Sequence, residues 1–114
     1  MITSYIDFKS PDCFLALYPI LRLAEDCRVN VSWQPFRTKG RALPTQVASE
    51  SVTQSHHHVR TESERRLQRH YADVRGLDID PSRAQVDTSA ALRWLAGLEG
   101  DSSLFVKRAF SAHW

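Results

Sequence analysis

Hydrophobic and polar residues alternate at the start of the chain, and the alternation then gives way to a helical pattern. Residues 2–8 (Ile-Thr-Ser-Tyr-Ile-Asp-Phe) alternate as a short buried strand does, and residues 29–34 do so again. Between them, residues 11–26 predict a helix of about four turns that is apolar around most of its circumference. Short connections join the three elements. The sequence therefore predicts a right-handed strand–helix–strand unit with parallel strands.

The residues at the start of this helix carry the candidate chemistry. Ser10 stands where an N-cap belongs, and Pro11 stands at the first helical position, where its fixed φ and missing N–H cost nothing. Asp12 and Cys13 follow in the first turn. This end of a helix dipole is positive and has unpaired backbone N–H groups, so it favours a thiolate, an oxyanion or a bound anion. An ordinary capped helix explains the same four residues.

The middle of the chain changes character. Residues 37–58 show no sustained period and predict a loop or linker between a first unit (1–36) and a helical part (59–114). The segment from Thr61 to Arg75 predicts a helix whose start can lie earlier, within the histidines, and which Gly76 ends. Charged residues of both signs surround its apolar stripe. The stripe consists of Val59, Leu67, Tyr71 and Val74.

Two shorter helices are predicted to complete the chain. Asp87-Thr88-Ser89 caps a helix over 90–98, and Asp101-Ser102-Ser103 caps a last one. The side chains expected to face inward are Leu92, Trp94, Leu95 and Ala96 on the first, and Leu104, Phe105, Ala109, Phe110 and Trp114 on the second. The turn at residues 77–81 connects these helices to the preceding one.

Composition and charge set the outer bounds. A length of 114 residues predicts one small domain, and a formal charge of +2 is too small to argue for a nucleic-acid partner. The longest apolar run is interrupted by Tyr18-Pro19 and Arg22, so no membrane span is predicted. The N-terminus has no basic region followed by an apolar core, and we therefore expect a cytoplasmic protein without a secretory signal.

The cysteines and histidines could form a disulfide or a metal site, but their spacing in the sequence argues against both. Cys13 and Cys27 lie 14 positions apart on one predicted helix, which is about 21 Å along its axis and too far for a disulfide. Cys27 is expected to be a small apolar filler. Adjacent side chains of His56-His57-His58 diverge by about 100° on a helix, and His70 is the only nearby candidate ligand. We therefore predict no metal site.

The opening run resembles a known family. "YIDFKSPDCFLALYPILRLAEDCRVNVSWQPF" is similar to the N-terminal unit of DsbA-like thioredoxin-fold proteins, in the branch of 2-hydroxychromene-2-carboxylate isomerase and kappa-class glutathione transferase. Later segments, "RRLQRHYADVRGLDI" and "VDTSAALRWL…FVKRAFSAHW", resemble the helical insertion of the same family more loosely. The resemblance implies an α/β fold of thioredoxin type in which the C-terminal half, including a strand preceded by a cis-proline, is missing.

The resemblance also implies a function. In redox members a Cys-x-x-Cys replaces Ser-Pro-x-x, and its first position carries the chemistry; here that position is Ser10. Ser10 would stabilise the thiolate of glutathione as cofactor, and Pro11, Asp12 and Cys13 would line the pocket, for isomerisation or conjugation of a small aromatic electrophile. Two alternatives stay open. One is a thiol-disulfide oxidoreductase that uses Cys13, and the other is a truncated, non-catalytic interaction fragment.

The predicted two-stranded sheet also bears on whether the chain forms an oligomer. A two-stranded sheet has an exposed edge and is marginal by itself. We therefore expect a homo-oligomer that buries either this edge or the surface of Phe14, Leu17 and Leu21 against a second copy.

Overall fold

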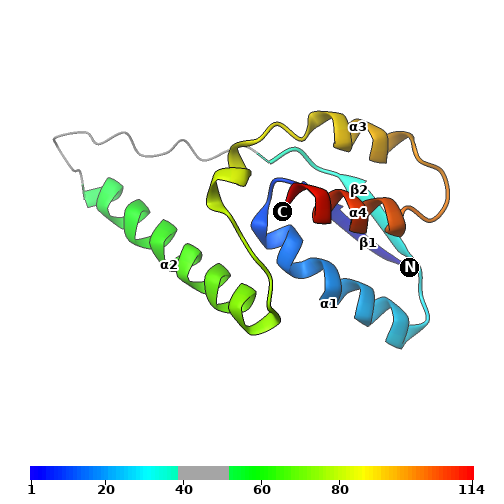
Figure 1. Cartoon of the computed structure of the whole chain (residues 1–114), viewed down its shortest axis with the longest axis horizontal. Helices are drawn as coiled ribbons and strands as arrows, with labels where there is room; N and C mark the ends of the chain where they lie inside the picture. The colour runs from blue at the N-terminus through cyan, green and yellow to red at the C-terminus, as the bar shows by residue number, and fades with distance from the viewer. Residues whose placement is uncertain (39–51) are drawn as a thin grey trace.

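The computed structural model describes residues 1–38 and 52–114, and within these the side chains of 1–38 and 59–114. The elements follow in the order β1 (Ile2–Ile6), α1 (Pro11–Cys27), β2 (Val31–Pro35), α2 (Val52–Arg75), the 3₁₀ helix η1 (Pro81–Gln85), α3 (Ser89–Gly97) and α4 (Ser103–His113) (Figure 1). β1 and β2 are parallel neighbours, with Ile2 opposite Val31 and Ile6 opposite Pro35. The predicted strand–helix–strand unit is thus confirmed.

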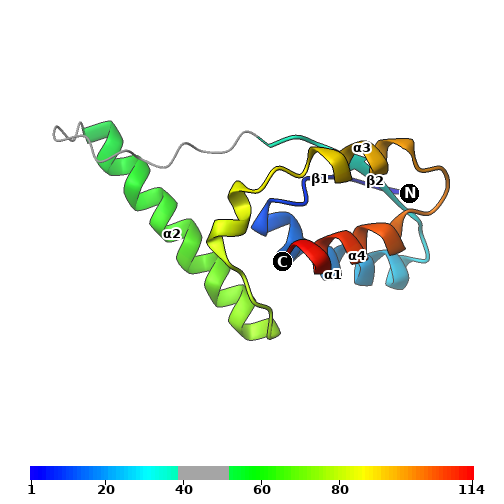
Figure 2. The ribbon, with the colours of Figure 1, turned by 45° about the horizontal axis from the view of Figure 1, so that its top comes forward.

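Two helices from distant parts of the sequence cover the sheet together. Figure 2 shows α1 and α4 on one side of the two strands, with α3 alongside β2. The core lies between these elements, because each of them turns apolar side chains toward it. Its buried members are Ile6, Phe8, Phe14, Leu17, Trp33, Leu92, Leu95, Val106 and Phe110.

Aromatic contacts and two indole hydrogen bonds fix α4. The ring of Phe110 lies 5.0 Å from that of Phe8 and 6.0 Å from that of Phe14, centroid to centroid. The Trp33 indole N–H donates to the Ser103 hydroxyl at 2.9 Å, where α4 begins. The Trp114 indole N–H donates to the Phe8 carbonyl at 2.9 Å, where α4 has ended. Each of these indoles thus has a partner, and both ends of α4 are fixed.

Several predictions about individual helices are wrong in detail. α2 begins at Val52, so residues 52–58 of the predicted loop are helical; the pattern allowed a start within His56–His58, and the helix begins four residues before that. Residues 39–51 lie outside the described residues. Trp94 of α3 is exposed because it projects from the side opposite Leu92 and Leu95. Ala96, one turn after Leu92 near the end of the helix, is exposed as well. Leu104 of α4 is exposed as well, whereas Val106, which the sequence pattern did not single out, is fully buried.

The interface predicted for Phe14, Leu17 and Leu21 is wrong for Phe14 and Leu17, and Leu21 is half-buried. Leu17 is 1% exposed and Phe14 is 7% exposed, because α4 already covers this side of α1. Cys27 is exposed at the last position of α1 rather than serving as an apolar filler, since the chain turns away at Arg28, whose φ is 54°. Both cysteines are free, as their spacing predicts.

The apolar stripe of α2 does not reach the core. Val59, Leu67, Tyr71 and Val74 are all exposed, and Ala72 is the one buried residue among the described side chains of the helix. No helix in the described ranges is both long enough and apolar enough to cross a bilayer.

A polar contact fixes the C-terminal end of α2 against α1. Pro19 lies inside α1, and its missing N–H leaves the carbonyl of Leu15 without the usual helical donor. The guanidinium of Arg75, at the last position of α2, donates to that carbonyl. The proline therefore creates an acceptor on α1, and the arginine of α2 satisfies it.

This arrangement predicts a coupling between Arg75 and Pro19. Arg75→Met should lower the free energy of unfolding by about 1 kcal/mol, because it leaves the Leu15 carbonyl unsatisfied. In a Pro19→Ala background the same change should cost clearly less, since the substituted alanine supplies the missing helical N–H. Urea unfolding of the four proteins of this double-mutant cycle measures the coupling, with Arg69→Met as the matched control. Equal costs in both backgrounds would contradict the assignment.

Candidate functional site

The N-terminus of α1 is built as the sequence predicts. Ser10 is the N-cap, and its hydroxyl oxygen accepts the N–H of Cys13 at 3.3 Å. The Ser10 carbonyl accepts the N–H of Phe14 at 3.1 Å. Pro11 has no N–H, so Asp12 supplies the one remaining backbone donor of the first turn. The Ser10 hydroxyl also keeps its own proton, for which the described residues provide no acceptor.

The other predicted site residues are placed by their neighbours. The Asp12 carboxylate accepts a hydrogen bond of 2.8 Å from the Gln68 side chain of α2, so it is turned toward that helix. Cys13 is half-buried and packs against the core, and its backbone rather than its thiol contacts Ser10. The structure thus brings Ser10, Pro11, Asp12 and Cys13 together in one helical turn, each in a different environment.

Trp114 is a residue near this site that sequence reasoning did not assign to it. Its ring stacks on Phe14 at 5.9 Å with an interplanar angle of 4°, directly after the four predicted residues. Its indole N–H binds the carbonyl of Phe8, in the loop that enters α1. No local pattern links positions 8, 14 and 114, because only the docking of α4 brings them together.

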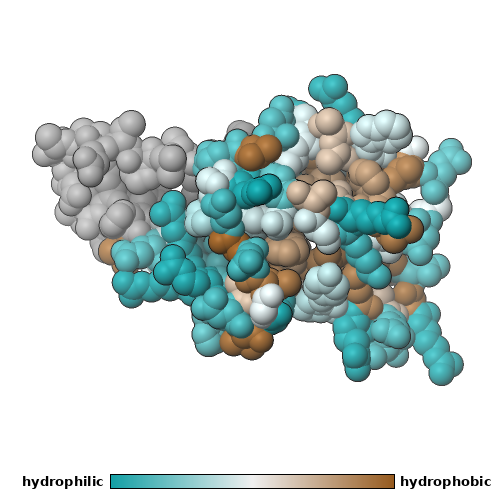
Figure 3. Space-filling view, viewed as in Figure 1, coloured by the Kyte–Doolittle hydropathy of each residue, from teal (hydrophilic) through white to brown (hydrophobic). Residues whose placement is uncertain are grey.

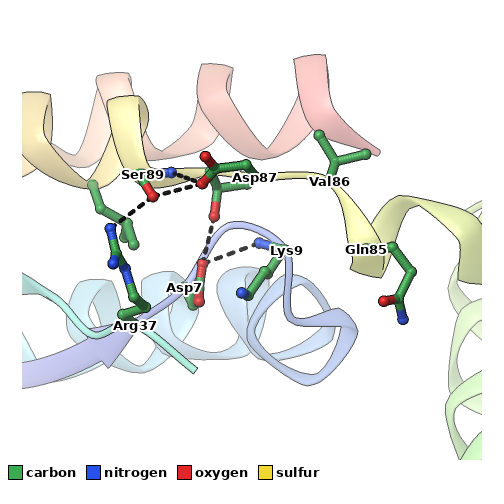
Figure 4. Close-up of a pocket in the computed structure, with 9 residues that line it drawn as sticks. Asp7, Lys9, Arg37, Gln85, Val86, Asp87 and Ser89 are labelled. Carbon is green, nitrogen blue, oxygen red and sulfur yellow. Dashed lines mark hydrogen bonds between the residues drawn. The ribbon is translucent and has the colours of Figure 1, made fainter. Parts of the chain in front are cut away.

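A polar cavity of about 330 Å³ adjoins the helix end (Figure 4). Lys9, the residue before Ser10, lines it from the loop after β1, and Arg37 lines it from the segment after β2. The opposite wall runs from Gln85 to Ser89, with Leu92 behind it. The cavity therefore lies at the carboxyl ends of the two parallel strands, which is where ligands bind in open α/β sheets.

Asp7 forms the floor of this cavity. Its side chain is 0% exposed, and its carboxylate accepts four hydrogen bonds. One oxygen accepts the Lys9 N–H at 3.3 Å and the Thr88 hydroxyl at 2.8 Å. The other accepts the N–H and the hydroxyl of Thr38, both at 2.8 Å. Burial by itself raises the pKa of the Asp7 carboxyl, but these bonds outweigh it and hold the pKa below its ordinary value.

The mouth of the cavity carries charges of both signs. Arg37 donates to the Ser89 hydroxyl at 2.7 Å, and Ser89 in turn donates its N–H and hydroxyl to Asp87 at 2.9 and 2.5 Å. These bonds from Ser89 are the main cause that lowers the pKa of Asp87, and the nearby charges of Arg37 and Lys9 add to it. Lys9 makes no side-chain hydrogen bond to another described residue. Its ammonium group can therefore bind a ligand carboxylate.

Among the residues that the structure describes, no three His, Cys, Asp or Glu side chains lie close enough together to hold a metal ion. His56, His57 and His58 lie within α2, and their side chains fall outside the described residues.

Comparison with known proteins leaves the family open. Neither a family model nor a curated protein nor a solved structure matches this chain. What the fold and the site define is a mixed α/β chain with a parallel strand–helix–strand unit and a polar site at the carboxyl ends of its strands.

The buried carboxylate generates a stability prediction. Asp7→Asn should destabilise the fold by about 1–3 kcal/mol, because the amide N–H₂ would face donors that now bind one of the carboxylate oxygens. Urea unfolding near neutral pH measures the change. Asp78→Asn, at an exposed position after α2, is the matched control and should have little effect. If Asp7→Asn left the free energy of unfolding unchanged, the role assigned to this hydrogen-bond network would be contradicted.

The Asp7 carboxyl also predicts how the stability of the fold depends on pH. Its pKa is lowered in the folded state, so its contribution to stability is complete above the unfolded value of about 4 and is lost as the pH falls toward the folded value. The unfolding free energy of the wild type should therefore fall more steeply below about pH 4 than that of Asp7→Asn. The variant should keep a shallower slope from Asp80, Asp87 and Asp101, whose pKa values are also lowered. Parallel slopes would exclude Asp7 as a source of acid sensitivity.

Proposed function

We propose that this chain is a DsbA-like thioredoxin-fold protein that binds glutathione as a thiolate at the N-terminus of α1, for isomerisation or conjugation of a small aromatic electrophile. The single observation that carries the proposal is the pair of donors at this helix end, the Ser10 hydroxyl proton and the Asp12 N–H. Both favour the charged form of a thiol placed beside them. A bound thiolate supplies the nucleophile, and the chain supplies its stabilisation.

Two neighbouring features fit the rest of such a ligand and its substrate. Glutathione carries two carboxylates, and Lys9 and Arg37 offer cations in the adjoining cavity. The ring of Trp114, which is half-buried and stacks on the buried Phe14, supplies an aromatic surface beside the same turn. These contacts support binding of an aromatic partner near Ser10 more than binding of a disulfide.

The geometry does not favour the alternative in which Cys13 acts as a redox thiol. Cys13 packs toward the core, and Cys27 lies at the far end of α1, about 21 Å along the helix axis. A dithiol mechanism requires a second thiol within reach.

The proposal predicts opposite effects from two neighbouring substitutions. Ser10→Ala removes a charge-assisted hydrogen bond worth roughly 1.5–3 kcal/mol, so it should raise the pKa of the bound glutathione thiol by about one to two units. Asp12→Asn should lower that pKa, because it removes a negative charge from the same helical turn. Ultraviolet absorbance of the thiolate, titrated against pH with glutathione present, measures both.

Controls separate this proposal from its alternatives. Ser10→Ala also removes an N-cap, at a cost of about 1 kcal/mol, so stability is measured in parallel. Cys13→Ser should leave the thiolate signal nearly unchanged, whereas it would abolish the activity of a Cys13-dependent oxidoreductase. Absence of any thiolate signal near neutral pH with the wild type would favour a non-catalytic interaction module.

We also propose that the chain forms a homo-oligomer through the free edge of β1. The ladder bonds at Ile2 and Ile6 place the backbone groups of Thr3 and Tyr5 away from β2. Among the described residues, no other strand pairs with that edge. An unpaired edge is a ready template for another strand.

Tyr5→Pro tests this assembly, because proline removes an outward N–H and leaves the ladder to β2 intact. Sedimentation velocity should show a concentration-dependent oligomer for the wild type and a monomer for the variant. Circular dichroism and urea unfolding confirm that the variant is folded. A wild type that stays monomeric across micromolar concentrations would refute the assembly.

A further inference from the structure

A second cavity lies on α1 away from the Ser10 site, where three helices meet. Its volume is about 760 Å³, which is large enough for a small organic molecule. Its walls come from the second half of α1, from the last residue of α2 and from α4. Tyr18, the nearest of its α1 residues to Ser10, is eight positions further on, about 12 Å along the helix. The two sites are therefore distinct.

The floor of this cavity is apolar. This floor is the part of the cavity lining that Tyr18, Pro19 and Leu21 of α1 supply, and the side chain of Tyr18 is half exposed. On the face seen in Figure 1, apolar and hydrophilic side chains lie side by side over α1 and the C-terminal end of α2 (Figure 3). A ligand with a flat or apolar body can cover this floor without burying an unpaired polar group.

Cations from all three helices surround the floor. Arg22 comes from α1, Arg75 from α2 and Lys107 from α4, and Glu25 is the single carboxylate in the lining. Arg22 pairs at 3.4 Å with Asp26, but both side chains are largely exposed, so this pair is weak and easily exchanged for a ligand. The lining thus has an excess of positive charge.

Arg75 is held in place before any ligand arrives. Its guanidinium donates to the Leu15 carbonyl freed by Pro19 and lies 5.8 Å from the centre of the Tyr71 ring. A guanidinium has five N–H donors, and the carbonyl takes only some of them. Arg75 can therefore bind a carboxylate without first losing the freedom of a mobile side chain.

We propose that this cavity binds a small organic carboxylate with an aromatic or aliphatic body. The apolar floor would contact the body, and Arg75, Lys107 and Arg22 would bind the carboxylate. The inference is independent of the function proposed for Ser10, because no residue of that site lines this cavity.

Naphthalene-2-carboxylate is a suitable probe, and naphthalene-2-carboxamide is its neutral counterpart of nearly the same shape. Calorimetric titration should show saturable binding of the carboxylate and at least tenfold weaker binding of the carboxamide. The carboxylate affinity should also fall as salt is added, because its partners are exposed cations. Amide shifts in a ¹⁵N-labelled sample should concentrate near Tyr18, Arg22 and Lys107.

Charge variants test the assignment to this cavity. Lys107→Gln should weaken carboxylate binding about two- to fivefold, and the double variant Arg22→Gln/Lys107→Gln about tenfold. The matched control is Arg65→Gln/Arg93→Gln, which changes the net charge equally at exposed positions outside the cavity. It should bind as the wild type does. Equal loss in this control, equal binding of the carboxamide, shifts centred on Ser10 to Cys13, or no saturable binding would each overturn the proposal.

Discussion

The buried carboxylate of Asp7 ties together three segments that are distant in sequence. It accepts bonds from the loop that enters α1, from Thr38 after β2 and from Thr88 before α3. An unpaired charge in this position would be costly, since the side chain has no exposure to water. The four bonds remove that cost and at the same time set where the loops after both strands lie. Lys9 and Arg37 reach the same cavity because these loops meet at Asp7.

Helix α2 is held by a different kind of contact. Only Ala72 is buried among its described side chains, so hydrophobic burial contributes little to its position. The hydrogen bonds that join it to α1 run from Gln68 to Asp12 and from Arg75 to the Leu15 carbonyl. Each of these hydrogen bonds contributes only about 1 kcal/mol or less to the net free energy of folding, because water competes for the same groups. The core beneath α1 and α4 therefore stabilises the fold, and α2 is placed on it by individual polar contacts.

A helix or strand could be predicted from the sequence where nearby residues specify it strongly. Alternation at residues 2–8 and Ser10-Pro11 before an apolar run determine β1 and the start of α1, and both lie where the pattern places them. Helical periodicity alone does not tell which face is covered. Trp94 and Leu104 are large and apolar, yet they are exposed, because burial depends on which helix docks on which side. The stacking of Trp114 on Phe14 and the bond of Arg75 to Leu15 depend on contacts between distant residues, which no local pattern encodes.

Because local patterns do not encode contacts between distant residues, only one of the two parts of the candidate site could be predicted from the sequence. The helix end at Ser10 is formed by residues that are neighbours in sequence, and four consecutive residues specify its cap and its free donors. The cavity beside it is assembled from the ends of two strands and the entry to α3, so its charges become neighbours only after folding. A ligand that spans both parts would bind through local donors at one end and through assembled cations at the other. Replacing the Asp7 side chain would displace the loops that carry those cations while leaving the Ser10 cap in place, since Ser10 accepts its capping bonds from Cys13 and Phe14 and donates its own N–H to the backbone carbonyl of Asp7 rather than to its carboxylate.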